Sequence, residues 1–71
     1  MGTGQAAKLV MMANQIARAF QVHGEAEAVP QIAQHIRKFW DPRMRAAIQA
    51  HAAAGGEGLE PLALKAVGEL K

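Results

Sequence analysis

Apolar side chains recur along the chain at intervals of three and four residues, the spacing that places them on one face of an α-helix. The first run predicts a helix from about Gln5 to Val22, followed by Gly24 as a C-terminal cap residue. Polar residues occupy the opposite face. The apolar face consists of Leu9, Met12, Ala13, Ile16 and Phe20. This helix therefore has one side to bury.

Two further helices are predicted on either side of the Asp41-Pro42 dipeptide. The second begins near Ala28, with Pro30 in its first turn. Its apolar face consists of Val29, Ile32, Ala33, Ile36, Phe39 and Trp40. Asp41 is expected to cap the third helix and Pro42 to begin it, and Gly55-Gly56 ends it. The apolar face of the third helix consists of Met44, Ala47, Ile48, His51 and Ala52.

A fourth, shorter helix is predicted from Pro61 to about Leu70. Its apolar side chains cover about half of the helix circumference at about 100° per residue. They are Leu62, Ala63, Leu64, Ala66, Val67 and Leu70. So wide a stripe needs two neighbours, whereas a small bundle normally offers one. The surplus suggests contact with another chain.

The four predicted helices give an all-α fold, a small bundle of three main helices plus a short C-terminal helix. Residues 1–7 are expected to form a flexible N-terminal tail, and residues 8–71 a single helical domain. A chain of 71 residues is near the lower limit for independent folding, and without cysteine it has no disulfide to stabilise it. Stability must then come from helix packing or from association with another chain, of which association is the better hypothesis.

Charge and hydropathy argue against two classes of partner. The formal net charge of +2 is too small to make nucleic acid or a membrane surface the expected partner. No apolar run approaches the roughly 20 residues of a membrane span. The N-terminal residues show no secretory signal pattern. A cytoplasmic protein is expected.

The side chains needed for catalysis or metal binding are sparse. The chain has no Ser, Tyr or Cys, and its one Thr is Thr3. His23, His35 and His51 fall on three different predicted elements without a ligand spacing, and His51 is better explained as a core or interface histidine. We therefore expect no catalytic, cofactor-binding or metal-binding residue on this chain.

Four of the eight Lys and Arg residues lie within the nine residues from Arg37 to Arg45. Arg37 and Lys38 complement the helix dipole in the last turn of the second helix. Arg43 and Arg45 stand in the first turn of the third, where a cation is disfavoured by about 0.3–1 kcal/mol. They suggest a carboxylate-bearing surface, in this chain or in another. The alternative is a helix-turn-helix DNA-binding regulator, with Arg43, Arg45 and Gln49 on its recognition helix.

Three segments together resemble the delta subunit of NAD-dependent formate dehydrogenase. They are Met12-Ala13-Asn14-Gln15-Ile16-Ala17, the run from His35 through Phe39-Trp40-Asp41-Pro42-Arg43-Met44-Arg45, and Ala53 to Leu62. The Phe-Trp-Asp-Pro-Arg-Met-Arg run is the most specific. The resemblance extends over roughly Lys8 to Leu70, and the order and separation of the segments make coincidence improbable.

The resemblance implies a non-catalytic accessory subunit of a cytoplasmic molybdenum- or tungsten-dependent complex that oxidises formate and reduces NAD. It also implies that molybdopterin, iron–sulfur clusters and FMN belong to partner subunits. On this interpretation one surface of the chain binds the large catalytic subunit, and the isolated chain can self-associate through it. The expected contact residues are Trp40, Arg43, Met44, Arg45, Leu62, Leu64, Val67 and Leu70. Met11, apolar on the polar face of the first helix, is a further candidate.

Overall fold

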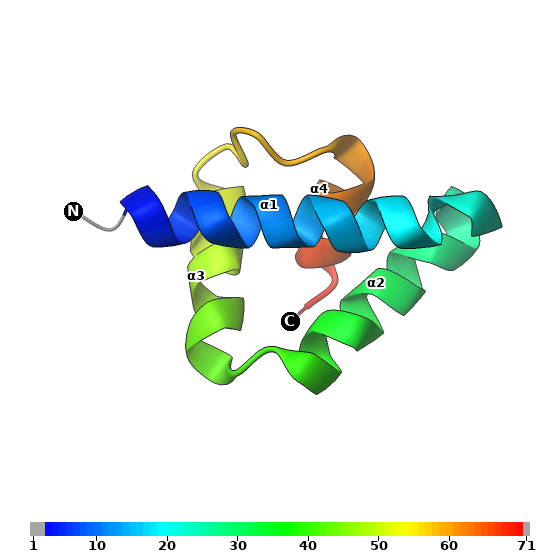
Figure 1. Ribbon diagram of the computed structural model, residues 1–71, viewed down its shortest axis with the longest axis horizontal. Coiled ribbons are helices and arrows are strands. Elements are labelled where there is room, and N and C mark those ends of the chain that lie inside the picture. Colours follow the sequence, from blue (N-terminus) through cyan, green and yellow to red (C-terminus); the bar gives the residue numbers. More distant parts are fainter. Residues whose placement is uncertain (1–2, 71) are drawn as a thin grey trace.

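The computed structural model describes residues 3–70, and every regular element among them is a helix. The elements are α1 (Thr3–Phe20), the 3-10 turn η1 (Gln21–His23), α2 (Glu25–Phe39), α3 (Pro42–Ala53) and α4 (Pro61–Gly68). The long α1 lies across α2 and α3, with α4 behind it (Figure 1). The all-α fold expected from the sequence, three main helices and a short fourth, is confirmed.

The helix α1 begins earlier than its apolar pattern indicated. It starts at Thr3 rather than Gln5, within the segment 1–7 that we assigned to a tail, while Met1 and Gly2 lie outside the described residues. At its other end, α1 passes through η1 to Gly24. Gly24 has a φ of 84°, which glycine adopts readily, and it ends the helical segment as predicted. The division into a flexible tail and a domain stays a prediction.

The helix α2 begins at Glu25, three residues before the expected Ala28. The amide of Ala28 donates to the carbonyl oxygen of Gly24 at 2.8 Å, so the helical ladder is already established there. Our placement of Pro30 in the first turn was therefore wrong, because Pro30 is the sixth residue of the helix. Lacking an N–H, it leaves the carbonyl of Ala26 without its intrahelical donor. Both acids of the first turn, Glu25 and Glu27, lie at the positive end of the helix dipole.

Alanine is the commonest residue in the buried core. Of the fourteen buried apolar residues in the described part of the chain, six are alanines with at most 1% exposure. They are Ala13, Ala17, Ala28, Ala33, Ala63 and Ala66. Alanine lets helix backbones approach closely, and the remaining space is filled by larger side chains such as Ile32, Ile36 and Ile48. The high alanine content thus serves tight packing as well as helix formation.

The helix α4 contacts all three of the other α-helices. Its residues Ala63, Ala66 and Val67 are buried, and Leu70 is buried just beyond its end at Gly68. This arrangement corrects the argument drawn from the wide apolar stripe. The neighbours that the stripe requires are supplied within the chain, because the short helix fits between its three companions.

Polar side chains of α1 fasten the start of α4 to the bundle. The Nδ2 of Asn14 donates to the carbonyl of Gly58 at 2.9 Å, and the amide of Glu60 donates to Asn14 Oδ1 at 2.9 Å. One turn further on, the Nε and Nη2 of Arg18 donate to Glu60 Oε2 at 2.9 and 2.6 Å. A segment more than forty residues away in sequence is thereby held against α1.

The turn after α3 is shaped by Gly56 and His51. Gly56 has a φ of 65°, and a Cβ there would lie 2.7 Å from Leu64 Cδ1, so both the backbone and the space favour glycine. The Nε2 of His51, which is half-buried, hydrogen-bonds with the carbonyl of Glu57 at 2.7 Å. The histidine placed on the apolar face of the third helix thus makes a structural contact within the chain.

Candidate interaction surface

The α2–α3 corner, residues Lys38–Arg45, contains the densest cluster of predicted contact residues. Only Trp40 and Asp41 separate α2 from α3, and both have extended backbones. Asp41 Oδ1 accepts a hydrogen bond from the amide of Met44 at 2.9 Å, and Pro42 occupies the first helical position. The predicted cap and proline start are confirmed. They fix the directions in which the neighbouring side chains leave the corner.

Two of the predicted contact residues in the corner have intramolecular roles. Trp40 is 5% exposed and belongs to the core of the chain. The Nη1 of Arg45 donates to the carbonyls of Arg37 at 2.9 Å and Trp40 at 3.2 Å. Its partner is therefore the negative, C-terminal end of α2, and not the carboxylate that we expected. A cation at the start of α3 is explained by the end of the preceding helix, so we leave Trp40 and Arg45 out of the surface proposed below.

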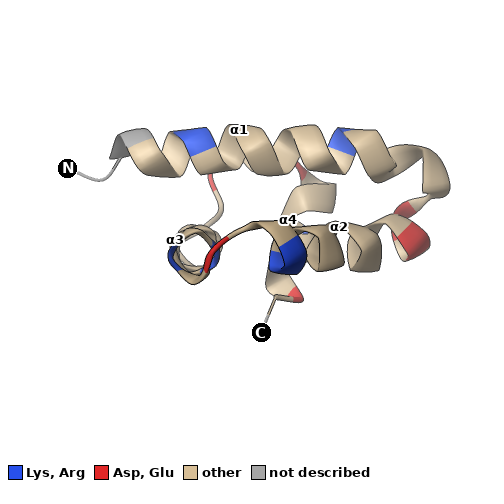
Figure 2. Cartoon of the chain, turned by 60° about the horizontal axis from the view of Figure 1, so that its bottom comes forward, with Lys and Arg blue, Asp and Glu red and all other residues tan. Residues whose placement is uncertain are grey.

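The four cations of the cluster fall into two pairs. Arg37, like Arg45, is engaged, because its Nη2 donates to the carbonyl of Glu69. Lys38 and Arg43 are exposed, and neither makes an ion pair or side-chain hydrogen bond within residues 3–70. Figure 2 shows the blue Lys and Arg segments of the ribbon where α2 ends and in α3. Lys38 and Arg43 are the charges that the fold leaves available.

Phe39 departs from its predicted place in the core and is 68% exposed. Ile36 and Trp40, both buried, fill the core at this end of α2. Phe39 lies about 60° around the helix from Ile36. Its ring instead packs on the flank of the helix against His35, with 4.7 Å between ring centroids. Helical periodicity could not predict that Phe39 is exposed, because it does not show how far the neighbouring helices extend over this face of α2.

Phe39 belongs to a continuous row of rings that we call the aromatic strip: Phe20, His23, His35 and Phe39. The centroid of Phe20 lies 6.3 Å from that of His23 and 6.1 Å from that of His35, the second pair in an edge-to-face arrangement. The strip joins α1, η1 and α2 along one side of the molecule. A surface hollow beside it is lined by Phe20, Gln31, Gln34, His35, Lys38 and Phe39. None of these lining residues carries a negative charge.

The remaining predicted contact residues differ in exposure. Val67 and Leu70 are 2% and 6% exposed, so they belong to the core and we leave them out of the proposed surface as well. Met44 and Leu62 are half-buried, and Arg43 is exposed. Leu64 is 36% exposed and lines an apolar hollow between α3 and α4, together with Gln49, Ala52, Ala53, Val67 and Gly68. Met11 is 55% exposed on α1 but belongs neither to the corner nor to the hollow between α3 and α4, so we leave it out of the proposed surface too.

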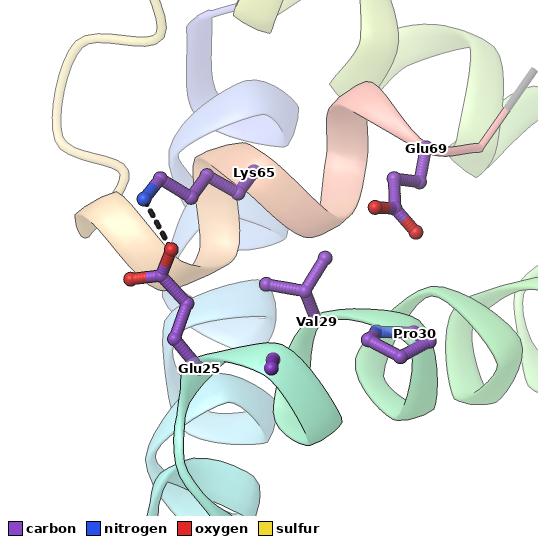
Figure 3. Close-up of a pocket in the computed structure, with 6 residues that line it drawn as sticks. Glu25, Val29, Pro30, Lys65 and Glu69 are labelled. Carbon is purple, nitrogen blue, oxygen red and sulfur yellow. Dashed lines mark hydrogen bonds and ion pairs between the residues drawn. The ribbon is translucent and has the colours of Figure 1, made fainter.

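A further hollow lies between α2 and α4 and is lined by charged residues (Figure 3). Lys65 forms an ion pair with Glu25 across it, and Val29 and Pro30 line its floor. Both charged side chains are more than half exposed, and such pairs contribute little to stability. Across residues 3–70, no group of three or more His, Asp or Glu side chains is placed to hold a metal ion.

The chain matches the family described as the NADH-dependent formate dehydrogenase delta subunit FdsD, over residues 8–67. This match covers most of the 71 residues and includes all three segments that carried the resemblance. The chain belongs to this delta subunit family. No curated protein and no solved structure matches it. Membership makes the chain a formate dehydrogenase delta subunit by family, and it confirms the resemblance.

The fold explains two of the segments that resemble the delta subunit family. In Met12-Ala13-Asn14-Gln15-Ile16, Ala13 is fully buried and Asn14 holds the loop before α4. In the corner, Trp40 fills the core and Asp41 caps α3. Lys38, Phe39 and Arg43 have no comparable task within the described residues. None of the helices in that part of the chain is long and apolar enough to cross a membrane.

Proposed function

We propose that the chain is a non-catalytic accessory subunit that stabilises or helps to assemble a cytoplasmic formate dehydrogenase by binding its large catalytic subunit. The observation that carries this proposal is the delta subunit family match over residues 8–67. In this proposal the enzyme is molybdenum- or tungsten-dependent and reduces NAD. Molybdopterin, iron–sulfur clusters and FMN reside in the partner subunits. Consistent with that division, the chain has no cysteine to ligate a cluster.

Two exposed regions support a role in binding. Arg43 leaves the α2–α3 corner with its guanidinium free of partners in the described residues, beside the half-buried Met44. Leu64 projects beside the apolar hollow between α3 and α4, next to the half-buried Leu62. Arginine and apolar side chains in such positions are typical of protein interfaces. We assign these four residues to the contact with the large subunit.

The alternative of a DNA-binding regulator gains no support from the corner. A short turn does separate α2 from α3, as in helix-turn-helix proteins. Of the three residues expected on a recognition helix, however, Arg45 is engaged by the end of α2 and Gln49 is half-buried. One exposed arginine on an alanine-rich helix is a poor basis for reading bases and phosphates. We therefore do not propose DNA binding.

Affinity purification of the tagged chain from its native cell tests the proposal. The large formate dehydrogenase subunit should co-purify, with molybdenum or tungsten in the purified material by metal analysis. One copy of the chain per large subunit would identify a permanent subunit. Association of the chain with only a small fraction of the large subunit would identify an assembly factor. Purified material without any formate dehydrogenase subunit would contradict the proposal.

A matched pair of variants tests the contact residues. Arg43→Ala should lower the amount of large subunit that is retained, because the group on the large subunit that binds the guanidinium loses its contact. Lys8→Ala removes another exposed cation, on α1, and should leave retention unchanged. Circular dichroism should show equal helicity for both variants. Equal retention by both would remove Arg43 from the interface.

A further inference from the structure

The aromatic strip combines exposed apolar area with an ordered geometry. Phe39 is 68% exposed, yet its ring is held against His35, and His35 in turn packs edge-to-face against Phe20. Phe39 therefore rests on one ring, that of His35, which is itself supported by Phe20. A large, well-positioned aromatic group with most of its area uncovered is typical of the residues that dominate interface affinity.

The charges around the strip have one predominant sign. Lys38 lines the hollow beside Phe39 and is joined there by Gln31, Gln34 and His35. His23 adds a second imidazole at the far end. The acid on the same flank of α2 is Glu27, about 16 Å along the helix from Lys38. A charged occupant of this hollow would meet the ammonium of Lys38 and two neutral amides, and would be favoured if it were negative.

Other acids of the chain are engaged elsewhere. Glu25 is paired with Lys65, Glu60 is paired with Arg18, and the carboxylate of Asp41 caps α3. No carboxylate of the described residues forms an ion pair with Lys38. Its ammonium is therefore available to a carboxylate of another molecule, and charge complementarity of this kind fixes register and partner choice.

We propose that the aromatic strip and Lys38 dock an acidic segment of the large catalytic subunit, which places an apolar or aromatic side chain on Phe39 and a carboxylate on Lys38. The inference rests on the proposed function for the identity of the partner, and it adds the surface and the chemistry of the bound segment. It also extends the binding face from the corner along α2 to η1. Phe39 is the central contact, and Phe20 and His35 position its ring.

A single-stranded nucleic acid is the competing occupant, because bases stack on exposed rings. Such sites combine several exposed rings with a cationic groove that follows the phosphates. Here Phe39 is the exposed phenyl ring, Phe20 is half-buried, and the hollow is lined by one lysine and two glutamine residues. An acidic protein segment needs only one carboxylate and one apolar group, and it fits this composition better.

The test co-expresses the tagged chain with the formate dehydrogenase subunits of its own organism and measures the large subunit retained per chain. Phe39→Ala should lower retention at least about ten-fold, as expected for a central aromatic contact. Lys38→Glu should lower it as well, because like charges then face each other, and retention by the unaltered chain should fall as salt rises. The matched controls are Met11→Ala and Lys8→Glu, an exposed apolar residue and an exposed cation on α1. Both controls should retain the large subunit fully.

A photo-crosslinking residue, benzoylphenylalanine, in place of Phe39 identifies the occupant directly. The expected product joins position 39 to a peptide of the large subunit that contains Asp or Glu, whereas the same group in place of Met11 gives none. Crosslinking of position 39 to nucleic acid or to a second copy of the chain would overturn the inference. Full retention by Phe39→Ala, with crosslinks only from position 11, would overturn the surface and leave the proposed function intact. No retention by the unaltered chain would contradict the proposed function, and the inference with it.

Discussion

The chain contains two junctions in which an acid and a proline begin a helix, and the two are built differently. At Asp41-Pro42 the carboxylate accepts from the amide of Met44, three residues ahead in its own helix. At Glu60-Pro61 the carboxylate makes no cap and pairs with Arg18 of α1. The shorter Asp side chain reaches an amide in the first turn of the helix that follows it, whereas the longer Glu side chain extends to another helix. The same sequence signal therefore gives a local cap in one case and a tertiary contact in the other.

The difference extends to the surfaces around the two junctions. The second is tied to α1 through both the backbone and the side chain of Glu60. The first is anchored from within by Trp40, which leaves Lys38, Phe39 and Arg43 outside. The side chain of Glu60 at the second junction is occupied within the fold, whereas Lys38, Phe39 and Arg43 at the first junction face outward. We infer that the first junction itself binds the partner, and that at the second Glu60 braces the fold while Leu62 and Leu64 of the following helix contact the partner.

The largest expected effect comes from removing the anchor of the first junction. Trp40→Ala should lower the free energy of unfolding by about 3–5 kcal/mol, because it deletes a large buried side chain. Urea unfolding followed by circular dichroism measures the change. The neighbouring Phe39→Ala is the matched control and should change stability by less than about 0.5 kcal/mol, since Phe39 is exposed. If Trp40→Ala lowered the free energy of unfolding no more than the small loss expected for Phe39→Ala, Trp40 would not be the anchor.

The second junction should be most sensitive at Asn14. Its side-chain amide accepts from the backbone N–H of Glu60 and donates to the carbonyl of Gly58, and Asn14→Ala removes both hydrogen bonds. A loss of about 2 kcal/mol in the free energy of unfolding is expected, since each bond contributes about 1 kcal/mol. Amide hydrogen exchange should also increase between Gly56 and Glu60, where the loop loses its attachment. The adjacent Gln15 is exposed, and Gln15→Ala should change neither quantity.

Much of the fold could be predicted because it depends on local patterns. Apolar spacing and the Asp-Pro and Gly signals located four helices, and both proline-started helices begin where the sequence indicated. The contacts that close the fold could not be predicted in the same way. Nothing local to Asn14 or Arg18 shows that their partners lie more than forty residues away. The early start of α2, despite Pro30, depends likewise on how the preceding turn ends.

The candidate surface was predicted in composition more than in geometry. The run from Lys38 to Arg45 was identified as unusual, and it does contain exposed cations and an exposed aromatic residue. Phe39, expected in the core, is nevertheless exposed, and Trp40, expected to contact a partner, is buried. A shift of one position along the chain decides which of the two rings faces the core. Arg45 was assigned to a carboxylate because a cation is disfavoured in the first turn of a helix. Its acceptors are backbone carbonyls at the end of α2, which the sequence does not reveal.

A smaller effect is expected at the cap of the first junction. Asp41→Ala removes the acceptor for the amide of Met44 and should cost about 1 kcal/mol, equivalent to roughly 4–8 °C in Tm for a domain of this size. Asp41→Asn keeps a good capping group and should leave Tm nearly unchanged. Thermal unfolding of the two variants separates the cap from the charge. A large loss with Asn would indicate that the charge of Asp41 matters more than its hydrogen bond.

The smallest effect is expected at the carboxylate of the second junction. Glu60 makes no side-chain cap, so Glu60→Ala removes only its pairing with Arg18, whose side chain is 67% exposed. A double-mutant cycle with Arg18→Ala should give a coupling of about 0.2–1 kcal/mol, and added salt should reduce it, because water and ions screen such a pair. The opposite result, a coupling of several kcal/mol that resists salt, would mean that this ion pair is a main support of α4. The bracing of the second junction would then depend on charge, and the hydrogen bonds of Asn14 would be secondary.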